Sequence, residues 1–121
     1  MLNCIFVGLG GFLGSILRYL LGLIRLRDGV YFPYKTLCIN ILGSFLIGLV
    51  AAYAAKHTEL NPKWVLFWKV GICGGFTTFS SFALETCQLM QGKHPAAAAL
   101  YMLVSFLLSV LAVLLAQLPM K

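Results

Sequence analysis

Charged side chains are scarce in this chain, and acidic ones are almost missing. Its 121 residues include nine lysine or arginine residues and three aspartate or glutamate residues, and 61% of the chain is hydrophobic. Only one carboxylate lies inside an apolar segment, and no nucleophile–base pair accompanies it, so nothing resembles an enzyme site. The formal net charge of +6 comes from cations scattered at segment ends. The basic patch that binding to nucleic acid requires is therefore missing as well.

The chain contains cysteine, but its spacing predicts neither disulfides nor a metal site. The four cysteines lie inside apolar segments without a Cys-x-x-Cys pair, and the two histidines lie in short connections. This spacing fits neither a zinc site nor a set of disulfides. We interpret the cysteines as small buried apolar residues. They are Cys4, Cys38, Cys73 and Cys87.

Long apolar runs, by contrast, make up most of the chain. Four of them reach the ~20 residues that a helix needs to cross the hydrocarbon core of a bilayer. The first run lacks the basic leader and cleavage site of a secretory signal, so we expect it to stay as a membrane anchor. The sequence predicts an all-α membrane protein, a single domain of four transmembrane helices over residues 1–121. The helices are expected at residues 2–24, 36–55, 64–90 and 96–118.

The balance of cations between the two ends of the spans is nearly even. Four spans place both termini on one side of the membrane, and this side carries Lys56, Lys63 and Lys121, with Lys69 within snorkelling reach. The other side carries Arg25, Arg27, Lys35 and Lys93. The lysine and arginine bias that normally fixes orientation is therefore almost absent. We expect insertion in both orientations and an antiparallel homodimer, which would also help so small a chain to enclose a polar pathway.

The third apolar run is interrupted where it should be most apolar. Residues 71–82 read Gly-Ile-Cys-Gly-Gly-Phe-Thr-Thr-Phe-Ser-Ser-Phe. Glycine is about 1 kcal/mol worse than alanine in a helix, and backbone groups freed inside a bilayer must find new partners. We predict that the helix breaks in mid-membrane at Gly74-Gly75 and that the hydroxyl residues after it cap freed groups. Phe79 and Phe82, three residues apart, then share one face of the resumed helix.

Polar residues occur at isolated positions in the other spans. The Asn40 amide must hydrogen-bond either a backbone carbonyl of another helix or a permeating anion. Arg18, six residues before the end of its span, either snorkels to the headgroups or faces an aqueous vestibule that attracts anions. Tyr101, Ser105 and Ser109 form one straight stripe at i, i+4 and i+8, as either a pathway lining or a packing seam.

Taken together, the motifs resemble the Fluc/CrcB family of small fluoride channels over essentially the whole chain. The resemblance is carried by Gly-Gly-Phe-Leu-Gly-Ser-Ile-Leu-Arg-Tyr at 10–19, Thr-Leu-Cys-Ile-Asn-Ile-Leu-Gly-Ser-Phe at 36–45 and Gly-Gly-Phe-Thr-Thr-Phe-Ser-Ser-Phe at 74–82. Three motifs in this order, in a chain of this length, are specific. One position departs from the pattern: Ser81 stands where the family leads us to expect threonine, and it keeps the hydroxyl.

The resemblance implies a dual-topology antiparallel homodimer with two fluoride pores, lying as a multi-pass protein in the lipid of the bacterial inner membrane. It also implies a structural sodium ion at the dimer centre, held by the backbone carbonyls of Gly74 and Thr77 from both subunits. Arg18 would lie near the vestibule. The pore would be lined by two phenylalanines and by polar residues from three spans. These implied pore residues are Thr36, Asn40, Phe79, Ser80, Phe82, Glu85, Tyr101, Ser105 and Ser109.

Three functions remain open on the sequence alone. The leading one is passive fluoride export, which would lower cytoplasmic fluoride toxicity. A small dual-topology multidrug exporter shares the size and charge balance, but it is expected to carry a glutamate in its first helix, where this chain has only Arg18. Glu85 keeps a proton-coupled mechanism open, although it lies near the end of its span. The third is a subunit that does not transport and packs through its glycine faces.

Overall fold

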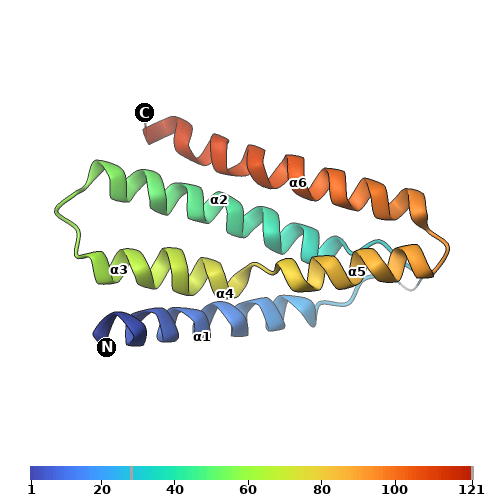
Figure 1. Cartoon of the computed structure of the whole chain (residues 1–121), viewed down its shortest axis with the longest axis horizontal. Helices are drawn as coiled ribbons and strands as arrows, with labels where there is room; N and C mark the ends of the chain where they lie inside the picture. The colour runs from blue at the N-terminus through green and yellow to red at the C-terminus, as the bar shows by residue number, and fades with distance from the viewer. Residues whose placement is uncertain (28, 121) are drawn as a thin grey trace.

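The computed structural model describes residues 1–27 and 29–120, which form a bundle of long helices (Figure 1). The all-helical prediction is confirmed, and three helices, α1, α2 and α6, are long and apolar enough to cross a membrane. Lys121, counted above on the side of the termini, lies outside the described residues. The elements are α1 (Leu2–Gly22), α2 (Tyr34–Lys56), α3 (Pro62–Leu66), the π-helix η1 (Phe67–Cys73), α4 (Gly74–Phe76), α5 (Phe79–Gln91), α6 (Pro95–Gln117) and the 3-10 helix η2 (Leu118–Met120).

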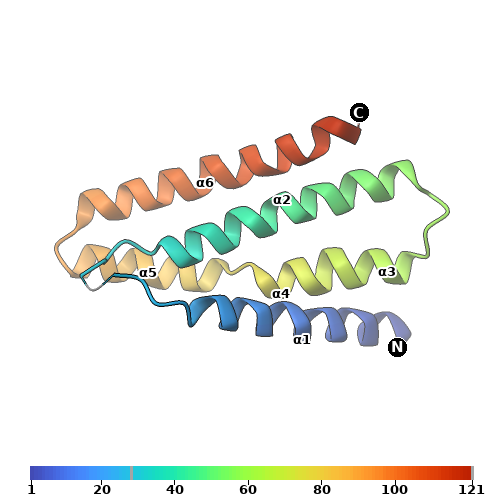
Figure 2. The same cartoon turned by 180° about the vertical axis from the view of Figure 1, so that it is seen from behind.

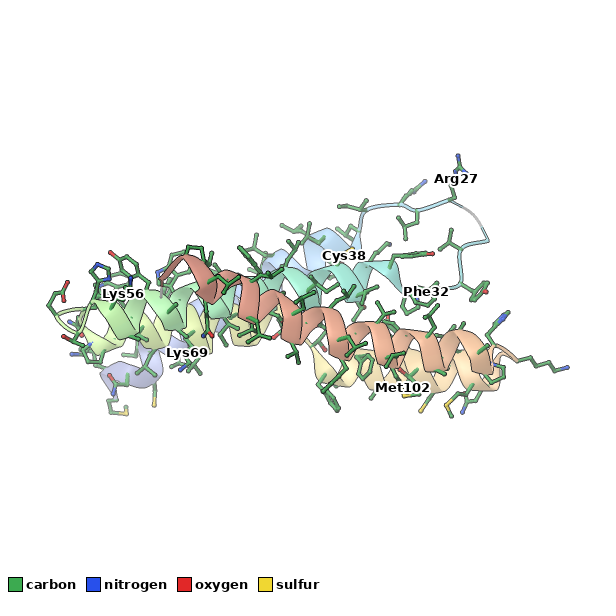
Figure 3. The ribbon with its side chains drawn as sticks, turned by 90° about the horizontal axis from the view of Figure 1, so that it is seen from above. Arg27, Phe32, Cys38, Lys56, Lys69 and Met102 are labelled. Carbon is green, nitrogen blue, oxygen red and sulfur yellow. The ribbon has the colours of Figure 1, made fainter. Side chains whose placement is uncertain are left out.

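The helices lie side by side with both termini at one end of the bundle, as four spans require (Figures 1 and 2). The connection between α2 and α3 is at the same end, and the other two connections are at the opposite end. Arg27 stands at the outer edge of the long connection after α1, whereas Phe32 lies back near the helices (Figure 3). The third span is therefore the composite of α3, η1, α4 and α5, which runs between the two ends.

Two pairs of neighbouring segments make the bundle. In one pair, α2 packs on α6, and the backbones approach closely at Gly48 of α2. A Cβ on Gly48 would lie only 2.9 Å from the carbonyl oxygen of Val113. In the other pair, α1 lies against η1 and α4, where a Cβ on Gly10 or Gly14 would collide with backbone of the third span. The predicted small-xxx-small packing of Gly10 and Gly14 is thus confirmed, because only glycine lets the backbones approach so closely.

The third span begins at the expected proline but breaks at a different place. Pro62 is the first helical residue, and the Asn61 side chain caps the helix by accepting the Lys63 N–H at 3.0 Å. The predicted break at Gly74-Gly75 is wrong: Gly74 is helical, with φ −65° and ψ −36°. The chain leaves the helix at Thr77 (ψ 157°) and Thr78 (ψ 117°) and re-enters it at Phe79.

The displacement of the break has a physical reason. A Cβ on Gly75 would lie 2.7 Å from the carbonyl oxygen of Gly11, so this glycine serves close packing with α1 rather than unwinding. The preceding segment, η1, already carries the wider hydrogen-bond pattern of a π-helix, which is frequent near functional sites. What ends the helix is a side chain of α2, described next, which takes over backbone groups of Thr78.

Candidate functional site

The break in the third span is held open by one side chain, Asn40 of α2. Its Nδ2 donates to the Thr78 carbonyl oxygen at 3.0 Å, and its Oδ1 accepts the Thr78 N–H at 2.8 Å. The amide therefore hydrogen-bonds both the N–H and the C=O of Thr78, in place of the partners that a continuous helix would provide. Lipid could not satisfy these two backbone groups. Of the two alternatives for Asn40, the contact to backbone is the one present, and one of its two Nδ2 hydrogens remains for another acceptor.

Two carbonyl groups lose their usual donors because of this arrangement. In a continuous helix the Thr78 N–H would donate to the Gly74 carbonyl, but it donates to Asn40. Likewise, the Ser81 N–H donates to the Thr78 Oγ1 at 3.1 Å and not to the Thr77 carbonyl. Gly74 is exposed, and nothing lies within 4 Å of the position of a Cβ on it. Carbonyl oxygens freed by an unwound helix are typical ligands of an alkali cation, so the donor set fits sodium.

An apolar cavity with a few hydroxyl groups lies beside the break. Its volume is about 430 Å³, and it extends between α2, the break and α6. Phe79, with 79% of its surface exposed, stands at this cavity with its ring centroid 5.6 Å from that of Phe82. The predicted common face of the two phenylalanines is thus present. The predicted site residues that line the cavity are Asn40, Thr77, Phe79, Phe82, Ser105 and Ser109, together with Gly74.

Ser105 is a lining residue of this cavity whose buried hydroxyl lacks a partner. It is buried, and among the described residues its Oγ is the buried side-chain atom without a hydrogen-bond partner. The bond from its hydroxyl to a carbonyl one turn earlier, which would have made it part of a packing seam, is therefore not formed. A buried polar atom without a partner calls for an explanation.

Glu85 lies at one end of the stripe on α6 and is engaged by two hydroxyl groups. The Thr36 hydroxyl donates to its Oε2 at 2.9 Å, and the Tyr101 hydroxyl donates to its Oε1 at 3.1 Å. Tyr101 is fully buried, with its ring centroid 5.1 Å from that of Phe82. The structure thus brings together Thr36 of α2, Glu85 of α5 and Tyr101 of α6 in one hydrogen-bonded group. Ser80 stays apart: it is exposed, and its Oγ lies 3.4 Å from the Thr78 Oγ1.

Arg18 does not snorkel to the end of the bundle. Its Nε donates to the Gly75 carbonyl oxygen at 3.1 Å, so the guanidinium turns toward the break. Arg18 also borders a second cavity of about 340 Å³ with Lys35, Thr36, Ser81 and Glu85. The Lys35 Nζ donates to the Gly22 carbonyl at 2.9 Å. This second cavity thus has two cations, one carboxylate and several hydroxyl groups on its walls.

Some residues of the site were not singled out from the sequence. Thr78 was considered only as a possible cap, although it is the backbone partner of Asn40. A Cβ on Gly43 would collide with the Thr77 methyl group, so only glycine fits there. Phe32 packs edge-on against Tyr101, with ring centroids 5.6 Å apart. The signal that pointed to Thr78 was the need of a buried amide for a backbone partner; nothing in the sequence pointed to Phe32.

Comparison with known proteins agrees with this architecture. Residues 5–117 match the family described as CrcB-like protein, Camphor Resistance (CrcB). A protein of Agrobacterium fabrum named "Fluoride-specific ion channel FluC" is 42% identical over 114 residues, which cover 93% of this chain and 91% of that protein. A protein of Azobacteroides pseudotrichonymphae with the same name is 42% identical over 118 residues, covering 95% of this chain and 94% of its own.

A third relative, from Chlorobium chlorochromatii and with the same name, is 43% identical over 100 residues, which cover 83% of this chain and 78% of its own. The family match over residues 5–117 spans all the elements that build the break and its two cavities. The resemblance drawn from the three sequence motifs is therefore confirmed. Because the family match extends over nearly the whole chain, this protein is a multi-pass membrane protein that belongs to the CrcB family of ion channels.

Proposed function

We propose that this protein is a fluoride-selective channel that exports fluoride passively across the bacterial inner membrane and so lowers cytoplasmic fluoride toxicity. The observation that carries the proposal is the cavity beside the break, which is lined by Phe79, Phe82 and Ser105 with its unpartnered hydroxyl. The names of the matched relatives supply the identity of the ion. An ion that flows outward at negative membrane potential needs no coupled energy source.

The chemistry of the cavity suits a small, strongly hydrated anion. A selective pore must replace the water shell of its ion with donors of its own. The Ser105 hydroxyl and the second N–H of Asn40 are such donors, and the positive edge of a phenyl ring is a weaker one. Among the residues that the structure describes, no lysine or arginine lines the cavity beside the break. Fluoride would therefore meet a series of modest sites that bind it and let it leave.

The single chain leaves this site incomplete, and an antiparallel homodimer with two pores would complete it. Phe79 is 79% exposed, and the cavity is lined by residues of α2, the third span and α6 of one chain. A second copy in the opposite orientation would close each cavity. The nearly even distribution of cations permits that orientation, and each subunit would then supply one of two equivalent pathways.

A structural sodium ion would hold the two copies together at the dimer centre. The Gly74 and Thr77 carbonyls lack their helical donors, and the exposure of Gly74 leaves room for the same pair from a partner. We expect that replacing sodium by N-methyl-D-glucamine weakens the dimer and abolishes flux, because no other donor would satisfy the four oxygens inside lipid. Measuring dimer fraction and fluoride flux against sodium concentration checks this. Unchanged dimer and flux at trace sodium would contradict it.

The function itself is tested in liposomes. Purified protein is expected to release fluoride and essentially no chloride when potassium ionophore clamps the potential. Phe79→Ile should reduce fluoride release about tenfold, which corresponds to ~1.4 kcal/mol of lost ion stabilisation, while the dimer persists. Phe12→Ile, at an exposed position of α1 outside the cavity, is the matched control. No fluoride release from a dimeric preparation would refute the channel, and organic-cation uptake driven by a proton gradient would favour an exporter built on Glu85.

A further inference from the structure

Arg18 makes a contact that attraction of anions does not require. Its Nε–H points at a backbone carbonyl, that of Gly75, at 3.1 Å, in a partly buried position on the side of α1 that faces the third span. Two turns earlier on the same side, the backbones of Gly11 and Gly75 approach so closely that a Cβ on Gly75 would lie 2.7 Å from the Gly11 oxygen. The Arg18 bond is therefore the continuation of the tight seam between α1 and the third span.

The accepting carbonyl is one that the break would otherwise leave without a donor. In a continuous helix Gly75 would accept the N–H of Phe79, but the chain is extended at Thr77 and Thr78. Inside a bilayer an unpaired carbonyl costs several kcal/mol. A guanidinium supplies a charge-assisted bond, which is about twice as strong as a neutral one. Arg18 thus caps the last turn of α4 from a neighbouring helix.

The two edges of the break are in this way fastened to two different helices. Arg18 of α1 holds the edge at Gly75, and Asn40 of α2 holds the edge at Thr78. In the chain, Gly74 comes directly before Gly75, which Arg18 contacts, and Thr77 comes directly before Thr78, which Asn40 contacts. The two contacts therefore constrain the direction of the Gly74 and Thr77 carbonyls from two neighbouring helices.

We propose that Arg18 is a positioning residue, which fixes the end of α4 so that the Gly74 and Thr77 carbonyls face a cation and Phe79 faces the anion path. This inference rests on the proposed function, because its test measures fluoride flux and the dependence of that flux on sodium. A residue that merely attracts anions would be replaceable by any cation at the same depth. A positioning residue needs the planar guanidinium, because lysine carries a compact point charge without the directed Nε–H.

The substitution Arg18→Lys separates the two roles, because it keeps the charge and removes the fork. The same substitution at Arg25, an exposed residue of the connection after α1, is the matched control. Both variants and the wild type are reconstituted in liposomes at one ionic strength while sodium is varied. For Arg18→Lys we expect about a tenfold fall in fluoride flux at low sodium, equal to ~1.4 kcal/mol, and a higher sodium concentration for half-maximal flux. Arg25→Lys should match the wild type in both measurements.

Other outcomes are equally decisive. If Arg18→Lys equals the wild type in flux and in sodium dependence while Arg18→Gln loses flux, Arg18 acts through its charge and the inference is wrong. If Arg18→Lys assembles only at raised sodium, the inference is supported, since added cation then compensates for misdirected carbonyls. Failure to assemble at any sodium concentration, with normal assembly of Arg18→Gln, would overturn it. If the wild type passes no fluoride, the proposed function fails, but the sodium dependence of thermal unfolding in the same three proteins still tests the positioning role.

Discussion

Substituting Gly14 by alanine is expected to destabilise the protein by about 3 kcal/mol or more. Most of the protein molecules should then fail to fold and assemble. A Cβ at this position collides with the Ile72 carbonyl oxygen and would lie 2.9 Å from the Phe76 amide nitrogen. One methylene too many in a packed interior costs ~1–3 kcal/mol even where side chains can move. Here the neighbours are backbone atoms of η1 and α4, so α1 would have to move away from the third span.

Gly8→Ala is the matched control for this prediction. It is the same substitution in the same helix, but nothing lies within 4 Å of the Cβ position. It should leave stability unchanged or raise it by up to ~1 kcal/mol, the difference in helix propensity between the two residues. The measurements are the fraction of monodisperse protein after purification and the midpoint of thermal unfolding. Normal folding of Gly14→Ala would show that α1 and the third span do not pack as described, and failure of Gly8→Ala alone would place the partner subunit on that face.

A membrane fold of this kind is largely predictable from hydropathy, because a bilayer forces every span to satisfy its own backbone. The approximate bounds of α1, α2 and α6 follow from that rule, and Pro62 marks the start of α3 as expected. The position of the break did not follow. Glycine signals a weak helix, but the chain breaks where the Asn40 amide competes successfully for the backbone of Thr78. That competition depends on the distance between two helices, which a single sequence does not contain.

The site was predictable to the same extent. Periodicity places Tyr101, Ser105 and Ser109 on one line of α6, and Phe79 and Phe82 on one face of α5, because a helix has a fixed repeat. Which partner each polar group takes was left open. Thr36 and Tyr101 could not be assigned to Glu85 from spacing alone, since they come from three separate helices. The roles of the implied pore residues and the sodium ligands remain predictions.

Asn40→Asp is expected to reduce fluoride flux by about 100-fold. This corresponds to ~2.7 kcal/mol, near the upper end of the ~1–3 kcal/mol that a buried, unpaired acceptor costs. The substitution preserves shape and keeps an oxygen to accept the Thr78 N–H at the 2.8 Å contact. At the other contact, 3.0 Å long, the Nδ2 donor is replaced by an oxygen that faces the Thr78 carbonyl. Two acceptors then oppose each other, and the N–H that remained for an anion is lost together with it.

The charge of the new carboxylate acts in the same direction, because it lies on the wall of the cavity that we propose for the anion. Fluoride flux in liposomes and the dimer fraction measured in parallel separate a blocked pathway from a misfolded protein. Asn61→Asp is the matched control: Asn61 accepts the Lys63 N–H at 3.0 Å in an exposed helix cap, and aspartate caps a helix equally well. Wild-type flux through Asn40→Asp would exclude this amide from the anion path, whereas loss of flux with an intact dimer locates the path at the break itself.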